Sequence, residues 1–353
     1  MAQISVVMPT YNTPVGILKE ATESILGQTF RDFEFIIVDD GSTNDSRSYL
    51  EGLADERIRL IRNPENIGIT KSLNIGFSAA RGKYIARMDA DDISLPDRLE
   101  KQLAFMERHP DVIVCGSAVR DFGAVDRVAK VRRMNVDMER YRIAALFGNP
   151  GPYHPTAFFN RELLLRHGLK YDEKLVYAQD YGLWVQIGRC GRVCNLKDVL
   201  LLRRVHANQI SGARRESQIR CDQMTQRKLL EALLGEVTEE ELVRHYRWSA
   251  GVLADAVFDG DASAWYRRLI AANDGRGVYD RRKLRRYVYG RVLRRLILNT
   301  LPQDATGVQK TKAFFRHLPF GAALYATAEE CARMLASVSD AGKNRGKGTS
   351  SSK

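Results

Sequence analysis

The first third of the chain alternates between short continuous apolar runs and stretches whose apolar residues follow a helical spacing. Continuous runs predict buried strands at residues 4–8, 33–38, 58–61, 84–88 and 112–115. Helical spacing predicts helices over residues 15–26 and 69–80, through Leu50 and Leu53, and along a face made by Leu95, Leu99, Leu103 and Met106. Strands that are apolar along their whole length and separated by helices predict an α/β fold with a parallel sheet covered on both faces.

The last third has a different pattern. From about residue 212 the sequence is helical in character, and residues 281–298 combine seven arginines with apolar and aromatic residues. This segment predicts either a helix that lies on an anionic membrane or a solvated helix packed on the preceding domain. On a helical wheel Arg291 and Arg295 fall within the arc of Leu284 and Val288, so the two faces are incompletely separated. Residues 341–353, rich in Gly, Lys and Ser, are expected to be disordered.

The charge distribution adds to this picture of the C-terminal region. The net charge is +12, and residues 211–353 contain 26 Lys and Arg against 16 Asp and Glu, whereas residues 1–210 contain 29 against 27. A basic region attracts phosphate-rich partners, which include an anionic membrane surface, a lipid-linked diphosphate and nucleic acid. The sequence has no zinc module or RNA-binding motif, so nucleic acid is not the expected partner.

Segments for membrane crossing or export are not apparent. No run approaches eighteen apolar residues, and the first five residues lack the charged-then-apolar pattern of an export signal. The five cysteines are odd in number, fit no compact zinc or disulfide spacing, and are interpreted as packing residues. They are Cys115, Cys190, Cys194, Cys221 and Cys331. We expect a cytoplasmic protein, with association at the cytoplasmic face of a membrane as an option for the basic region.

Three carboxylates follow the predicted strand at residues 84–88, namely Asp89, Asp91 and Asp92. Like charges this close disfavour joint ionisation unless a cation or water lies among them. Oxygen ligands select hard ions such as Mg²⁺ or Mn²⁺, which often complete their coordination with substrate phosphates. The cluster therefore predicts a divalent metal and a phosphate-bearing substrate. A solvated acidic turn before the helix start at residues 94–97 is the alternative interpretation.

The ends of the predicted strands carry polar residues as a set. Residues 10–12 follow the first strand, residues 39–40 the second and residues 89–91 the fourth. Ligands of parallel sheets bind beyond the carboxyl ends of the strands, so these residues are expected to converge on one crevice. No Gly-x-Gly-x-x-Gly segment follows the first strand and no Gly-Lys-Ser/Thr loop occurs, which disfavours a dinucleotide fold or a P-loop.

Five motifs in order carry a family resemblance: Pro9–Asn12, Val38–Ser42, Asn66–Gly68, Ala80–Gly82 and Met88–Asp92. Over roughly residues 3–212 the chain resembles a family 2 glycosyltransferase of the GT-A fold. The resemblance implies a mostly parallel nucleotide-binding sheet flanked by helices, with a helical C-terminal extension. It implies a catalytic domain at 1–212, with a nucleotide-sugar half at 1–116 and an acceptor half at 117–212. A basic helical region at 213–340 and the tail at 341–353 complete the expected organisation.

The resemblance also implies roles for the strand-end residues. The nucleotide-binding set comprises Pro9, Thr10, Tyr11, Asn12, Asp40, Lys71 and Asp89. Tyr11 would hold the base through its ring, Asp40 would accept a hydrogen bond from a uracil-type base, and Asp89 would hold the ribose. Asp91 matches the metal ligand, and Asp92 supports either role. Taken singly, these residues also fit a packed loop aromatic at Tyr11, a turn former at Asp40 and an exposed helix lysine at Lys71.

The acceptor half supplies the implied catalytic base. Residues 178–184 resemble the family's Glu-Asp-Tyr-x-Leu-Trp segment, so Asp180 matches the general base, with Gln179 where Glu is usual and Trp184 on the acceptor side. Gln keeps hydrogen bonding but lacks the charge of Glu. His154 is an acceptor-site candidate, although a histidine beside proline is more often structural. His206 matches a residue near the metal or diphosphate, which favours Mn²⁺ slightly over Mg²⁺.

The expected activity is an inverting, metal-dependent transfer of a sugar from a nucleotide-diphosphate sugar, UDP-linked by preference. The expected acceptor is a hydroxyl of a glycan or lipid-linked molecule in polysaccharide biosynthesis, and the basic C-terminal region is the candidate for peripheral membrane contact. A sugar-nucleotide nucleotidyltransferase is the closest alternative enzyme, but it usually needs a Gly-rich basic loop after the first strand. A polyanion-binding protein is the non-enzymatic alternative.

Overall fold

The computed structural model describes residues 2–124, 127–128, 137–205, 215–250 and 260–300. The chain divides into two compact units, Met1–Thr225 and Gln226–Lys353, which are described separately below. The predicted domain boundary at residue 212, the end of the basic region and the tail at 341–353 lie outside the described residues.

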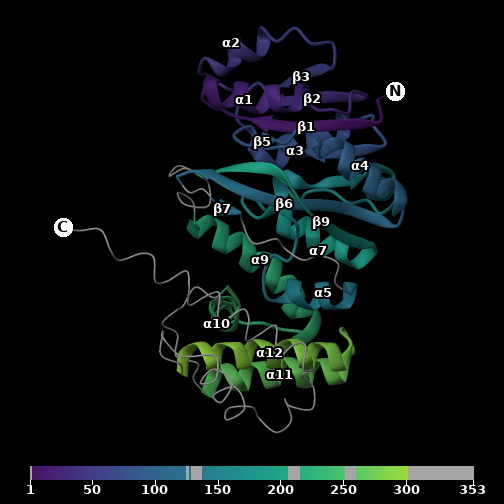
Figure 1. The fold of residues 1–353 in the computed structure, drawn as a ribbon. Helices are drawn as coiled ribbons and strands as arrows, with labels where there is room; N and C mark the ends of the chain where they lie inside the picture. Colours follow the sequence, from purple (N-terminus) through teal and green to yellow (C-terminus); the bar gives the residue numbers. More distant parts are fainter. Residues whose placement is uncertain (1, 125–126, 129–136, 206–214, 251–259, 301–353) are drawn as a thin grey trace, which may run out of the picture. The chain divides into compact units, whose positions relative to one another are not determined.

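The first unit is built on a nine-stranded sheet (Figure 1). Its parallel part has the order β3-β2-β1-β4, formed by β1 (Ile4–Thr10), β2 (Phe33–Asp39), β3 (Ile58–Arg62) and β4 (Tyr84–Arg87). The sheet continues through β8 (Phe158–Asn160), β6 (Val112–Gly123), β9 (Arg192–Val205) and β5 (Ile93–Ser94), while β7 (Arg127–Val128) pairs with β6. β8 pairs with both β4 and β6, antiparallel to each, and so joins the parallel part to the rest of the sheet.

Helices cover both faces of this sheet, which explains the continuous apolar strands. On one face α1 (Val15–Leu26) and α4 (Arg98–Arg108) pack on alternate strand residues such as Val6. On the other face lie α3 (Ile69–Ala79), α5 (Met138–Leu146), α6 (Arg161–Arg166) and α7 (Gln179–Cys190). Gly76 lets α3 approach closely, since a Cβ there would stand 2.4 Å from Cγ1 of Val7. The short α2 (Ser46–Glu51) follows β2.

Three predictions about the fold need correction: the length of one strand, the start of one helix and the role of one cysteine. The strand predicted at 112–115 continues to Gly123, because small residues such as Gly116 interrupt an apolar run that pairs with β9 throughout. The helix predicted through Leu95 begins only at Arg98. The packing role predicted for the cysteines is confirmed for three of them and is wrong for Cys190, which is exposed at the end of α7. Cys331 lies outside the described residues.

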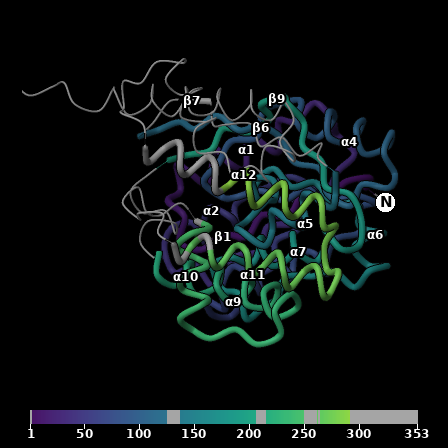
Figure 2. The backbone as a smooth tube through the Cα atoms, turned by 90° about the horizontal axis from the view of Figure 1, so that it is seen from below, coloured from purple at the N-terminus to yellow at the C-terminus, as the bar shows by residue number. Residues whose placement is uncertain are grey.

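The described residues of the second unit form helices, as the sequence predicts for this region (Figure 2). The long α9 (Arg215–Leu234) spans the boundary, and α10 (Glu239–Ala250), α11 (Gly260–Arg276) and α12 (Arg281–Thr300) follow. Indole Nε1 of Trp265 donates to His245 at 3.0 Å, which ties α11 to α10 in the interior. Among the described residues, no helix is long and apolar enough to cross a membrane.

The incomplete separation of apolar and basic faces that the sequence predicts for α12 can be compared with the burial and the partners of its residues. Leu284 and Val288 are fully buried, and Arg285 pairs with Asp274 of α11 at 2.5 Å. Arg291, which disturbs the apolar arc of the helical wheel, donates to the backbone oxygen of Ser249 at 2.6 Å. The apolar residues Leu284 and Val288 are therefore buried, while two arginines of α12 bind groups on α10 and α11 of the same unit.

Candidate active site

Three parallel strands end at one edge of the sheet. Thr10 at the end of β1 pairs with Asp39 at the end of β2, and Val7 pairs with Arg87 at the end of β4. The amide of Met88 still donates to the oxygen of Val7 at 3.0 Å, so the chain leaves β4 beside β1. The loops that follow these strands therefore lie next to one another, as expected for the ligand-binding edge of a parallel sheet.

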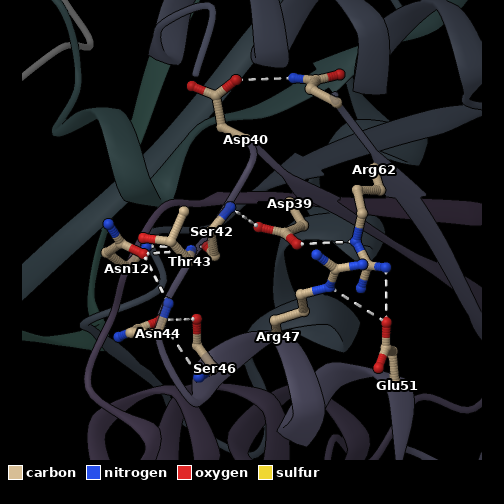
Figure 3. A network of polar contacts seen from close by, with 11 residues as sticks. Asn12, Asp39, Asp40, Ser42, Thr43, Asn44, Ser46, Arg47, Glu51 and Arg62 are labelled. Carbon is tan, nitrogen blue, oxygen red and sulfur yellow. Dashed lines mark hydrogen bonds and ion pairs between the residues drawn. The ribbon is translucent and has the colours of Figure 1, made fainter. Parts of the chain in front are cut away.

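Asn12 joins the loop after β1 to the loop after β2 (Figure 3). Its Oδ1 accepts from the amides of Thr43 at 2.8 Å and Asn44 at 3.3 Å, and its own amide donates to Oγ of Ser42 at 2.9 Å. The backbone of Asn12 has φ 48°, a left-handed conformation that Asn tolerates better than most residues. Asn12 thus fixes the shape of this edge.

Asp40 holds the turn that starts α3. Its Oδ1 accepts from Nδ2 of Asn63 at 2.8 Å and from the amide of Ile67 at 3.0 Å, and its Oδ2 accepts from the amide of Gly68 at 2.9 Å. Gly68 adopts φ 92°, a conformation that favours glycine. A carboxylate oxygen takes two hydrogen bonds, so Oδ2 of Asp40 retains capacity for one more donor.

The neighbouring Asp39 is fully buried and serves the fold. It accepts from the amide of Ser42 at 3.0 Å and from Nε of Arg62 at 3.2 Å (Figure 3). Arg62 also pairs with Glu51 of α2 at 2.6 Å, and this guanidinium lowers the pKa of Glu51. The pair of adjacent aspartates therefore ties β2 to α2 through Asp39 and to α3 through Asp40.

The other strand-end candidates differ in exposure. The Tyr11 ring is 48% exposed beside Asn12, so it is available to a ligand at this edge. Pro9 and Thr10 are buried at the end of β1, and Oγ1 of Thr10 lies 2.9 Å from that of Thr13. Lys71 is exposed in the first turn of α3, close in sequence to the turn that Asp40 holds.

The acid cluster follows β4 at the same edge. One carboxylate oxygen from each of Asp89, Asp91 and Asp92 lies within 4.8 Å of the others. Asp89 and Asp91 are partly exposed, whereas Asp92 is buried and accepts from the amide of Arg204 at 2.9 Å. Three oxygen ligands at this spacing fit a single hard divalent cation with open positions for substrate oxygens.

The electrostatics of the cluster favour an added cation. Burial raises the pKa of Asp89, and the neighbouring charge of Asp91 acts in the same direction. Burial also raises the pKa of Asp92 well above its usual range, with the charges of Asp89 and Asp91 adding to the effect. Arg87 forms an ion pair with Asp89 and opposes these shifts. A divalent cation would relieve the remaining repulsion.

Two buried arginines support the cluster, and the sequence analysis did not identify either. Arg87 ends β4 at 2% exposure, and Arg98 of α4 is fully buried. Nη2 of Arg98 donates to the backbone oxygen of Arg87 at 2.7 Å, while its Nε donates to Gln102 at 3.0 Å. Burial lowers the pKa of Arg98 to about 9. An arginine inside an apolar strand run was the available signal for Arg87.

Asp180 lies in the first turn of α7. Nδ2 of Asn149 donates to its Oδ2 at 2.8 Å, a partner that the sequence analysis missed. The charge of Asp180 makes a small contribution to the raised pKa of Asp89, after burial and the charge of Asp91. Gln179, the first residue of α7, is 7% exposed.

His154 and Trp184, the acceptor-side candidates, differ in exposure: His154 is partly exposed, whereas Trp184 is buried. Nε2 of His154 is 2.8 Å from the hydroxyl of Tyr171, and burial lowers the pKa of His154 well below its usual range. The indole of Trp184 is fully buried and stacks on Phe159 with 5.8 Å between ring centroids. Contact of either residue with an acceptor stays a prediction. His206 lies outside the described residues.

The family model for "Glycosyl transferase family 2" matches residues 5–168. An uncharacterised glycosyltransferase of Haemophilus influenzae is 31% identical over 231 residues, which cover 61% of this chain and 69% of that protein. The amylovoran biosynthesis glycosyltransferase AmsE of Erwinia amylovora is 33% identical over 202 residues, covering 56% and 74%. The uncharacterised glycosyltransferase MJ1057 of Methanocaldococcus jannaschii is 40% identical over 192 residues, covering 52% and 63%.

Solved structures share the fold. Residues 1–349 of S. aureus TarS in complex with UDP-GlcNAc align with a TM-score of 0.58 and 19% identity, covering 89% of each chain. The mannosyltransferase PcManGT of Pyrobaculum calidifontis, in complex with GDP-Man and Mn²⁺, aligns with a TM-score of 0.51 and 19% identity, covering 78% of this chain and 87% of that one. The predicted GT-A architecture is confirmed. The chain belongs to glycosyltransferase family 2.

Proposed function

We propose that the protein is an inverting glycosyltransferase that moves a sugar from a nucleotide-diphosphate sugar, UDP-linked by preference, to an acceptor hydroxyl. The observation that carries the proposal is the placement of Asp180. Its carboxylate stands at a helix start, is held by Asn149 at 2.8 Å, and its charge contributes to the raised pKa of Asp89 in the acid cluster. We propose that a base at this helix start serves a donor bound at the acid cluster.

The donor is bound by the strand-end residues. The exposed Tyr11 ring stacks on the base, and the remaining capacity of Asp40 Oδ2 accepts a hydrogen bond from it. Asp89 accepts a hydrogen bond from the ribose, and Asp91, with Asp92 beside it, would hold a divalent metal. A bound Mn²⁺ or Mg²⁺ supplies Lewis-acid stabilisation of the charge that develops on the leaving diphosphate.

Asp180 performs the proton transfer. Its carboxylate removes the proton of the acceptor hydroxyl as that oxygen bonds to the anomeric carbon. The bond between the anomeric carbon and the diphosphate oxygen breaks on the opposite face, so one displacement inverts the centre and releases the nucleoside diphosphate. The hydrogen bond from Asn149 fixes the carboxylate so that its other oxygen remains available to the hydroxyl.

The relatives support the substrate class. TarS was solved with UDP-GlcNAc and PcManGT with GDP-Man and Mn²⁺, so the shared fold accepts nucleotide-diphosphate sugars in those proteins. AmsE acts in amylovoran biosynthesis. On this basis we assign the chain to polysaccharide biosynthesis, with a glycan or lipid-linked acceptor and Mn²⁺ as the favoured metal.

The proposed organisation follows the substrate. Residues 1–212 form the catalytic domain, with the nucleotide-sugar half at 1–116 and the acceptor half at 117–212. The proposed phosphate-rich partner of the basic region at 213–340 is a lipid-linked acceptor or the cytoplasmic membrane surface, for which the excess of Lys and Arg in residues 211–353 is the support. Vesicle co-sedimentation at rising salt tests this contact: retention on anionic but not neutral vesicles supports it, and equal behaviour on both contradicts it.

The direct test is release of nucleoside diphosphate from a panel of UDP-, GDP- and dTDP-sugars. Each donor is incubated with Mn²⁺, Mg²⁺ or chelator, with water as the acceptor. Metal-dependent turnover of one donor, with the inverted anomer of the free sugar seen first by NMR, is the expected result. Absence of binding to every nucleotide, or release of the retained anomer, would contradict the proposal.

A further inference from the structure

Arg87 occupies a position where an apolar residue would suit the fold better. It is the last residue of a strand whose other members, Tyr84, Ile85 and Ala86, are all buried in the core. Its own side chain is 2% exposed, and its Nε and Nη1 have no hydrogen-bond partner among the described residues. Buried donors without acceptors destabilise a folded protein, so packing does not explain this arginine.

The backbone that carries this guanidinium is nevertheless held by two hydrogen bonds. The backbone amide of Arg87 donates to the oxygen of Ala157 at 2.8 Å, and its backbone oxygen accepts from Nη2 of Arg98 at 2.7 Å. The side chain reaches forward from this fixed backbone, and its Nη2 engages Oδ1 of Asp89. Of the three carboxylates in the acid cluster, Asp89 is the one that this buried cation contacts.

This contact divides the cluster. Carboxylate oxygens of Asp89, Asp91 and Asp92 lie within 4.8 Å of one another, so a divalent cation would draw all three inward if all were free to turn. Arg87 occupies one oxygen of Asp89 and supplies a fixed positive charge on that side. A metal ion at Asp89 would be repelled by the adjacent guanidinium, which makes Asp89 the least favourable metal ligand of the three, whereas a neutral hydroxyl can still donate to its remaining lone pairs.

We propose that Arg87 is a positioning residue that reserves Asp89 for the nucleotide and keeps it out of the metal coordination. The inference rests on the proposed function of this site. The inference predicts opposite changes in the affinities for the nucleotide and for the metal. Loss of Arg87 weakens nucleotide binding, because Asp89 is no longer oriented, and strengthens metal binding, because the cluster loses a positive charge and gains a free carboxylate.

The test measures the two affinities separately on the full chain. Mn²⁺ binding without nucleotide is followed by electron paramagnetic resonance of the free ion, and UDP binding at saturating Mn²⁺ by calorimetry. R87M should weaken UDP binding about tenfold or more, the scale of losses when a supporting residue is removed. The same variant should bind Mn²⁺ alone more tightly than wild type, and R87K should recover part of the UDP affinity because it keeps the charge.

Matched variants separate positioning from damage to the fold. R192M removes an arginine whose pair with Asp111 is exposed, and it should leave both affinities unchanged. R87Q provides the same comparison if R87M does not fold. D89N and the double variant R87M/D89N complete a cycle in which the losses of UDP affinity should be non-additive, because Arg87 acts through Asp89.

Parallel loss of Mn²⁺ and UDP affinity in R87M and R87Q would overturn the inference, as would additive losses in the cycle. Those outcomes leave the proposed function intact, because wild type would still bind both ligands. If wild type binds neither Mn²⁺ nor UDP, the proposed function fails first, and the inference fails with it. The two failures are therefore distinguished by the wild-type measurement.

Discussion

Replacing Asp40 with Asn tests how the nucleotide edge is built. Asp40 is 3% exposed and accepts three hydrogen bonds, two at Oδ1 from Asn63 and Ile67 and one at Oδ2 from Gly68. In D40N the amide oxygen can keep the two bonds at Oδ1, but the amide nitrogen faces the amide of Gly68, donor against donor. One charge-assisted bond is lost and the other two become neutral bonds.

The magnitude follows from this count. Hydrogen bonds to charged groups contribute about 1.5–3 kcal/mol and neutral ones about 1 kcal/mol, so the one lost and two weakened bonds of D40N should lower the free energy of unfolding by at least about 2.5 kcal/mol. Urea denaturation followed by circular dichroism measures the change. D45N is the matched control, because the exposed Asp45 before α2 makes no side-chain capping bond, and it should stay within about 0.5 kcal/mol of wild type. A D40N value as small as the control value would refute the reasoning.

Three further predictions concern the interior and the cysteines. Burial lowers the pKa of His154 below its usual 6.5, so the unfolded chain binds the proton first as pH falls. Stability of wild type relative to H154Q should therefore fall between pH 7 and pH 5, by up to about 1.4 kcal/mol per pH unit in urea titrations; parallel curves would contradict this. A Cβ at Gly151 would stand 2.0 Å from Cδ1 of Trp184, so G151A should cost about 1–3 kcal/mol of stability. G16A, with no heavy atom within 4 Å of the added Cβ, should cost nothing measurable, and equal losses would refute the packing argument. Peptide mapping after brief alkylation should find Cys190 modified before the three buried thiols, and simultaneous modification would show that the fold opens there.

The sequence predicts the first half of the fold well because β1, β2 and β4 are largely buried and mostly apolar along their length. Each of β1 to β4, including the partly exposed β3, begins where the pattern places it, and a parallel sheet brings the strand ends together without any knowledge of side-chain contacts. That topological rule places Tyr11, Asp40 and Asp89 at one edge. It needs only the order of strands and helices along the chain.

Contacts made across long sequence distances are beyond this kind of prediction. Asn149 meets Asp180 from a segment with no regular periodicity, 31 residues away. Arg98 lies on the apolar face of α4 and reaches the end of β4 only because the helix packs there. Trp184 matches an acceptor-side position in the motif, but it is buried because α7 turns that side toward Phe159. The spacing of a motif identifies such residues, but it does not determine where their side chains point or what they contact.

The central claim is that Asp180 is the base of an inverting transfer, and D180N tests it most directly. The donor identified in the panel is used at saturating Mn²⁺, and donor turnover is measured beside the affinity for UDP. The account predicts a fall in turnover of about a hundredfold or more, the scale of general-base catalysis, with UDP affinity within about twofold of wild type. Turnover of D180N close to the wild-type rate would contradict the account, because the amide of Asn cannot accept the proton that the base must remove.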